Sequence, residues 1–159
     1  MVAPKRPVIF WYFCVYVTLL VLLTLAPPPI SMSNGLYGTN LVPLLHSMSC
    51  FVPNPGQPST TLFCVRTIVG NVMMFVPLGI ILPLFAAELW SARGVLLVAL
   101  GSSVSIEVLQ FFGRYVGNPR WSDVDDVIFN VVGAMVGYWL LVVVVAHVKG
   151  GTRTPTDLC

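Results

Sequence analysis

The chain alternates between long apolar runs and short segments rich in turn-forming or charged residues. Four apolar runs predict membrane-spanning helices over residues 8–26, 67–87, 94–112 and 124–148. Each run is close to the roughly 20 residues that an α-helix needs to cross the hydrocarbon core of a bilayer. The pattern therefore predicts an all-α integral membrane protein, a four-helix bundle that forms one domain over residues 1–159.

The first apolar run ends at the triple proline Pro27–Pro29, which cannot continue a helix. A cleaved signal peptide is the alternative, because Lys5 and Arg6 would supply its basic N-terminal part. The run lacks a small-residue cleavage site before the prolines, and this favours an uncleaved anchor.

The second run holds Pro77 and Pro83 together with Gly70 and Gly79. Prolines are tolerated in membrane helices when neighbouring groups satisfy the freed backbone carbonyls. We therefore expect this helix to be kinked or broken.

Composition agrees with the apolar pattern and excludes other classes of protein. Of the residues, 57% are hydrophobic and 9% are charged, and the mean hydropathy is +0.89, whereas soluble domains carry roughly 25% charged residues. The net charge is +2 and the only basic run is Lys5–Arg6, so no nucleic-acid partner is expected. Without a C-x-x-C motif or a Cys/His cluster, we also expect neither a metal nor a cofactor.

Basic residues near the span ends predict the orientation in the membrane. An even number of spans puts both termini on one side, with the loops 27–65 and 113–123 on the other. The terminal side would carry Lys5, Arg6, Arg93, Lys149 and Arg153, against Arg66, Arg114 and Arg120 opposite. Because cytoplasmic segments are enriched in Lys and Arg, both termini are predicted to be cytoplasmic.

The long loop contains Cys50 and Cys64. In an oxidising compartment they could form a disulfide. Two free thiols in a folded loop are the alternative, and the sequence does not decide between them.

Polar residues in the third span share one face. Ser103, Glu107, Gln110 and Arg114 are separated by four, three and four positions, which places them on one stripe of a helix. A charged carboxylate in mid-bilayer costs about 2.5 kcal/mol or more, so Glu107 should face the bundle interior. It would there be a hydrogen-bonded glutamate, protonated or paired with one of the arginines Arg114, Arg66 and Arg120, or belong to a functional polar pocket.

The fourth span has a similar stripe of Asp123, Asp126, Asn130, Gly133 and Gly137, whereas Asp125 points away. Gly133 and Gly137 form a G-x-x-x-G motif that lets another backbone approach closely. Ordinary packing is favoured over a contact between chains, and the oligomeric state stays open. We expect this stripe to meet that of the third span, with Asn71 of the second span nearby.

Three explanations apply to the acidic cluster Asp123, Asp125 and Asp126. Carboxylates are favoured at a helix N-terminus by capping and by the helix dipole, with Ser122 or Asp123 as the N-cap. Pairing with Arg114 and Arg120 is the second explanation. A hard cation such as Mg²⁺ or Ca²⁺ is the third and weakest, because the spacing is not that of an EF-hand.

Four motifs in order resemble the VanZ-like family of small bacterial membrane proteins, named for an accessory determinant of resistance to the glycopeptide teicoplanin. They are NLVPLLH at 40–46, VGNVMMFVPLGIILPL at 69–84, SIEVLQ at 105–110 and R-x-x-DVDDVIFNVVGAMVGY at 120–138. The resemblance implies a multi-pass protein of the bacterial inner membrane and links some members to teicoplanin resistance, but it supplies no reaction. Its recurrent pattern matches Asn71, Pro77, Gly79, Glu107, Gln110, Asp126, Asn130 and Gly133.

The leading hypothesis is a non-enzymatic protein whose outward-facing polar pocket binds the head group of an envelope lipid or a lipid-linked precursor. The candidate ligand-binding residues are Arg66, Asn71, Glu107, Gln110, Arg114, Arg120, Asp126 and Asn130. The alternatives are a hydrolase or transferase with Glu107 or Asp126 as general base, and a small transporter or scramblase. No serine, cysteine or histidine is arranged as an activated nucleophile, so no catalytic residue is assigned.

Overall fold

Four long helices dominate the structure, a computed structural model that describes residues 6–26, 39–49, 52, 58–86, 89–118 and 122–150. The long helices are α1 (Arg6–Leu25), α3 (Pro58–Phe85), α4 (Ala92–Gly113) and α5 (Val124–Gly150). The short elements are β1 (Thr39–Asn40), α2 (Leu45–Ser49), the 3-10 helix η2 (Arg114–Val116) and β2 (Ser122–Asp123).

All four long helices are long and apolar enough to cross a membrane, which confirms the predicted all-α membrane fold. The spans are Pro7–Leu25, Cys64–Phe85, Ala92–Val116 and Val124–Val148. Helix α3 begins at Pro58 rather than at Thr67 and runs as one helix through Pro77 and Pro83. The structure thus shows no break at these prolines, and a kink there stays a prediction.

Glycines bring α3 and α5 into direct backbone contact. A Cβ atom on Gly133 or Gly137 would lie 2.1 Å from the Val72 carbonyl oxygen or 2.0 Å from that of Val76, respectively. In the other direction, a Cβ on Gly79 would lie 1.9 Å from the carbonyl oxygen of Ala134. The G-x-x-x-G face of α5 is therefore covered by α3 of the same chain, as in ordinary helix packing.

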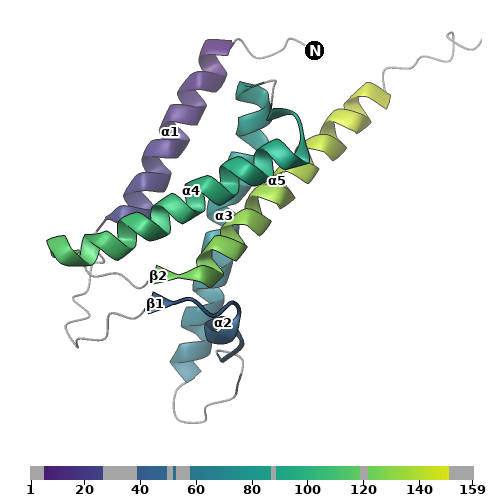
Figure 1. Ribbon diagram of the computed structural model, residues 1–159. Coiled ribbons are helices and arrows are strands. Elements are labelled where there is room, and N and C mark those ends of the chain that lie inside the picture. The colour runs from purple at the N-terminus through teal and green to yellow at the C-terminus, as the bar shows by residue number, and fades with distance from the viewer. Residues whose placement is uncertain are drawn as a thin grey trace, which may run out of the picture.

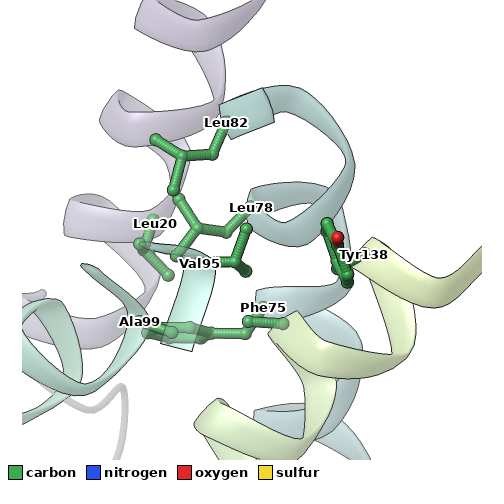
Figure 2. Close-up of a cluster of buried hydrophobic side chains, with 8 residues drawn as sticks. Leu20, Phe75, Leu78, Leu82, Val95, Ala99 and Tyr138 are labelled. Atoms are coloured by element: carbon green, nitrogen blue, oxygen red, sulfur yellow. The ribbon is translucent and has the colours of Figure 1, made fainter. Parts of the chain in front are cut away.

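Apolar side chains from all four long helices form the core around α3 (Figure 2). Leu78 of α3 packs in this cluster with Leu20 of α1 and Val95 of α4, and Tyr138 joins it from α5. The fully buried members are Phe75, Val95, Ala99 and Ala134. This core fixes α4 and α5 relative to each other, and these two helices carry most of the polar residues discussed below.

The short elements gather at one end of the bundle, opposite the N-terminal end of α1 and the C-terminal end of α5 (Figure 1). Strands β1 and β2 pair in parallel, Thr39 with Ser122 and Asn40 with Asp123. The connections between the first and second spans and between the third and fourth spans therefore meet here, as an even number of spans requires. The apolar pattern did not predict β1, β2 or α2.

Candidate functional site

Glu107 is buried in the C-terminal half of α4 and is hydrogen-bonded to β2. Its Oε2 atom accepts hydrogen bonds from the Ser122 hydroxyl at 2.9 Å and from the Asp123 backbone N–H at 2.9 Å. The carboxylate therefore faces the protein interior rather than lipid, as its cost in hydrocarbon requires. Within the described part of the chain its partners are a hydroxyl and a backbone amide, and no arginine is among them.

Two further polar pairs connect neighbouring spans. The Asn71 side-chain amide on α3 donates to Oδ1 of Asp126 on α5. One helical turn further along α5, Asn130 donates to the Ser103 hydroxyl on α4 at 2.8 Å. The polar stripes of α4 and α5 thus meet, with α3 beside them, as the spacing predicted.

Asp125 is the most buried carboxylate described, at 2% exposure. It accepts hydrogen bonds from the Leu44 backbone N–H, the Ser47 backbone N–H at 3.0 Å and the Ser47 hydroxyl at 2.6 Å. As the spacing predicted, the Asp125 side chain points away from the stripe that contains Asp126. It points toward α2 and not toward solvent. Sequence reasoning missed this role, although the apolar motif at 40–46, lying outside the spans, required a partner.

Arg114 lies at the end of α4 beside β1. Its guanidinium donates to the Thr39 hydroxyl at 3.1 Å and stacks over the ring of Phe111, 4.3 Å from its centroid. Among the residues that the structure describes, no ion pair joins it to Glu107 or to the acidic cluster. Of the other arginines assigned to the pocket, Arg66 has an exposed side chain, and Arg120 lies outside the described residues.

Gln110 is hydrogen-bonded to α1, unlike the other polar residues of its stripe. Its side-chain amide donates to the carbonyl oxygen of Thr24 at 2.9 Å, while Asn118 donates to that of Leu25 at 2.7 Å. The two amides therefore satisfy carbonyl groups at the C-terminal end of α1, which no further turn of helix would satisfy. Gln110 Oε1 has no hydrogen-bond partner within the described part of the chain.

A groove of about 410 Å³ runs along α4 over Glu107. Its polar lining is Thr39, Glu107, Ser122 and Asp123, and its apolar lining is Leu41, Val104, Val108, Phe111, Phe112, Val124 and Val127. Val104, Val108 and Phe112 are exposed on the side of a membrane span, so the groove opens sideways. The exposed part of its lining is almost wholly apolar and suits a hydrocarbon chain, with the buried Glu107 carboxylate at its base.

The candidate ligand-binding residues thus fall into two groups, those at the groove and those that join helices. Glu107 lines the groove, and Arg114 contacts two of its lining residues, Thr39 and Phe111. Asn71, Asp126 and Asn130 form bonds between helices and are not part of the groove lining. Over the described residues, no group of three or more His, Cys, Asp or Glu side chains could hold a metal ion.

The two described cysteines differ in oxidation state. Cys64, at the start of the second span, is disulfide-bonded, and Cys14 in α1 is free. Cys50, which the sequence offers as a possible partner of Cys64, lies outside the described residues. Cys64 lies in the same half of α3 as Asn71, which pairs with Asp126.

Comparison with known families agrees with the motifs. The model of the family described as VanZ/LLP1 matches residues 11–145, most of the chain. The chain belongs to the VanZ/LLP1 family. The matched range includes the groove and all the polar pairs of this VanZ-like bundle. Comparisons with curated proteins and with solved structures gave no match.

Proposed function

We propose that this multi-pass VanZ-like protein binds the head group of an envelope lipid, or of a lipid-linked precursor, in the groove beside Glu107. One observation carries the proposal: apolar walls that face the bilayer lead to a buried carboxylate with an arginine beside the groove. A lipid can enter such a groove from the side. A water-soluble ligand would have to cross the exposed valines of α4.

The polar groups define the chemistry of the head group. The Glu107 carboxylate can accept hydrogen bonds from hydroxyl, amide or ammonium groups, and the Arg114 guanidinium suits a phosphate or a carboxylate. At the helical rise, residues seven positions apart are separated by roughly 10 Å along the axis. The proposed ligand therefore carries an anionic group near the membrane surface and a hydrogen-bond donor closer to its hydrocarbon chain.

We place the groove on the outer side of a bacterial inner membrane, with both termini in the cytoplasm. The distribution of Lys and Arg supports this orientation. The disulfide of Cys64 supports it independently, because disulfides persist in oxidising compartments. A lipid held there would alter the access of teicoplanin to its target, which is how the protein would contribute to resistance.

The test combines teicoplanin susceptibility with analysis of bound lipid. Glu107→Gln, Arg114→Ala and Val108→Trp are expressed in a susceptible bacterium, and the purified proteins are assayed by mass spectrometry for retained lipid. Glu107→Gln keeps an acceptor for Ser122, and Val108→Trp fills the groove. Leu140→Trp is the control, since Leu140 is exposed on α5 and does not line the groove.

We expect the control to behave as wild type and each groove variant to lose about tenfold in retained lipid, equivalent to about 1.4 kcal/mol, together with resistance. Protein levels in the membrane should be equal. Wild-type resistance and lipid content in all three groove variants would refute the proposal. A chemically altered lipid would support a hydrolase or transferase instead, and lipid flux in reconstituted vesicles would support a transporter.

A further inference from the structure

Residues 39–49 expose large apolar side chains although they lie outside the four spans. Leu41, Val42, Leu44, Leu45 and Met48 are between 41% and 77% exposed. The segment contains no Asp, Glu, Lys or Arg. Exposed apolar patches of this kind mark contacts with a membrane or another protein.

The backbone of this segment is hydrogen-bonded to an extent that a water-facing loop does not need. The N–H groups of Val42, Leu45 and Met48 donate to Asn40 Oδ1, to the Val42 carbonyl and to the Leu44 carbonyl at 3.1, 3.3 and 2.8 Å. Pro43 has no N–H group to satisfy.

Asp125 satisfies three further donors in the middle of the segment. It accepts from the backbone N–H groups of Leu44 and Ser47 and from the Ser47 hydroxyl. Leu44 has a φ of 62°, in the left-handed region, so its own N–H group is not part of a regular helix or strand. Where lipid replaces water, backbone polar groups must find their hydrogen-bond partners within the protein.

The residues next to this segment indicate its depth relative to the membrane. Thr39 accepts a hydrogen bond from Arg114, and the next residue, Tyr115, is exposed. Arginine and tyrosine at a span end are typical of the membrane interface. Leu41 also lines the groove with Val104 and Val108, so the apolar surface of the segment is continuous with the lipid-facing side of α4.

We propose that residues 39–49 form a re-entrant segment that inserts its apolar side chains into the interface of the lipid bilayer, with Asp125 as the positioning residue that makes this possible. The segment then forms a wall of the groove at the level of the lipid head groups. The inference concerns where the segment lies and stands whether or not the groove binds a specific lipid.

The test measures the depth of single positions in vesicles of phosphatidylcholine and phosphatidylglycerol. An environment-sensitive fluorescent amino acid is introduced by stop-codon suppression at position 45 or 48 of the full chain. Positions 140 and 91 are the controls, because Leu140 is exposed on a span and Ser91 lies in the connection between α3 and α4. Quenching by lipids brominated near the head group is compared with quenching by aqueous iodide.

We expect positions 45 and 48 to resemble position 140, with strong lipid quenching and loss of iodide quenching. Iodide quenching as strong as at position 91 would overturn the proposal. Protection from both quenchers that depends on the ratio of protein to lipid would also overturn it, since a second protein would then cover the segment.

A second variant tests the role of Asp125. In Asp125→Ala, three donors lose their acceptor, and we expect positions 45 and 48 to shift from lipid to iodide quenching while circular dichroism still reports the helices. Retained lipid quenching in the folded variant would refute the role of Asp125. If Asp125→Ala does not fold, Asp125→Asn, which keeps one acceptor oxygen, should give a smaller shift in the same direction, and no shift would refute the role.

Discussion

The side-chain amide of Asn130 on α5 donates a hydrogen bond to the hydroxyl of Ser103 on α4 at 2.8 Å, and both residues are buried. This pair lies between the two helices that carry most of the polar site. Ser103 is fully enclosed, so no water competes for its hydroxyl in the folded protein. The bond therefore helps to fix the distance between α4, which carries Glu107, and α5.

The first prediction concerns the energy of this pair. A double-mutant cycle of Ser103→Ala and Asn130→Ala should give a coupling energy of roughly 0.6 kcal/mol and at most about 1.7 kcal/mol, the range of side-chain hydrogen bonds between membrane helices. Unfolding in mixed micelles, followed by circular dichroism, measures it. Strictly additive single variants would show that the bond contributes nothing.

The second prediction concerns the contact between α3 and α5. Gly137→Ala places a methyl group 2.0 Å from the Val76 carbonyl oxygen, so the two backbones must separate, and the free energy of unfolding should fall by about 1–3 kcal/mol. Gly70→Ala in α3 is the matched control, because a Cβ there meets nothing within 4 Å. The control should be neutral or stabilised by up to about 1 kcal/mol. Equal stability of the two variants would contradict the packing.

The third prediction concerns the attachment of α1. Gln110→Leu removes the donor to the Thr24 carbonyl, which should loosen the last turn of α1 and accelerate deuterium uptake there. Leu109→Ala is the control, since Leu109 is exposed on the adjacent side of α4. Unchanged uptake at the end of α1 in Gln110→Leu would show that Asn118 holds this end alone.

The fourth prediction, which rests on the proposed lipid site, distinguishes two contributions of Arg114 to lipid retention: its positive charge and the geometry of its guanidinium group. Phe111→Leu removes the ring beneath the guanidinium, and a cation–π contact at an exposed site contributes about 0.5–1 kcal/mol. Lipid retention should therefore fall about two- to fivefold, less than in Arg114→Ala. Arg114→Lys keeps the charge but loses the planar fork and should lie between wild type and Arg114→Ala. Retention in Arg114→Lys as low as in Arg114→Ala would mean that charge alone contributes nothing.

The sequence predicted those features that depend on helical periodicity. Four long apolar runs were sufficient to place the spans, because a bilayer leaves few alternatives for such segments. The spacing of three and four positions correctly brought Ser103 and Asn130 together and turned Glu107 inward. The second span was predicted at 67–87 and is observed at Cys64–Phe85, but helix α3 begins earlier, at Pro58, because it extends beyond the apolar run.

Features that depend on tertiary contacts were not predictable in the same way. The spacing put Arg114 on the Glu107 stripe, but its guanidinium contacts the Thr39 hydroxyl and the Phe111 ring rather than the Glu107 carboxylate, and spacing alone does not fix where so long a side chain reaches. Gln110 meets α1 rather than α5 because α4 crosses the bundle obliquely, and the two ends of its stripe reach different neighbours (Figure 1). The hydrogen bonds from Leu44 and Ser47 to Asp125 join positions about 80 residues apart. No helical or strand periodicity relates such distant positions, so the sequence pattern could not predict them.

The bonds of Gln110 and Asn118 to the end of α1 also constrain the order in which the protein assembles. The carbonyl groups of Thr24 and Leu25 emerge early in synthesis, whereas their donors follow 86 and 93 residues later. The first span therefore enters the membrane before the groups that complete its last turn have been translated. The last turn of α1 is therefore completed only when the third span and the residues that follow it arrive, although α1 is made first.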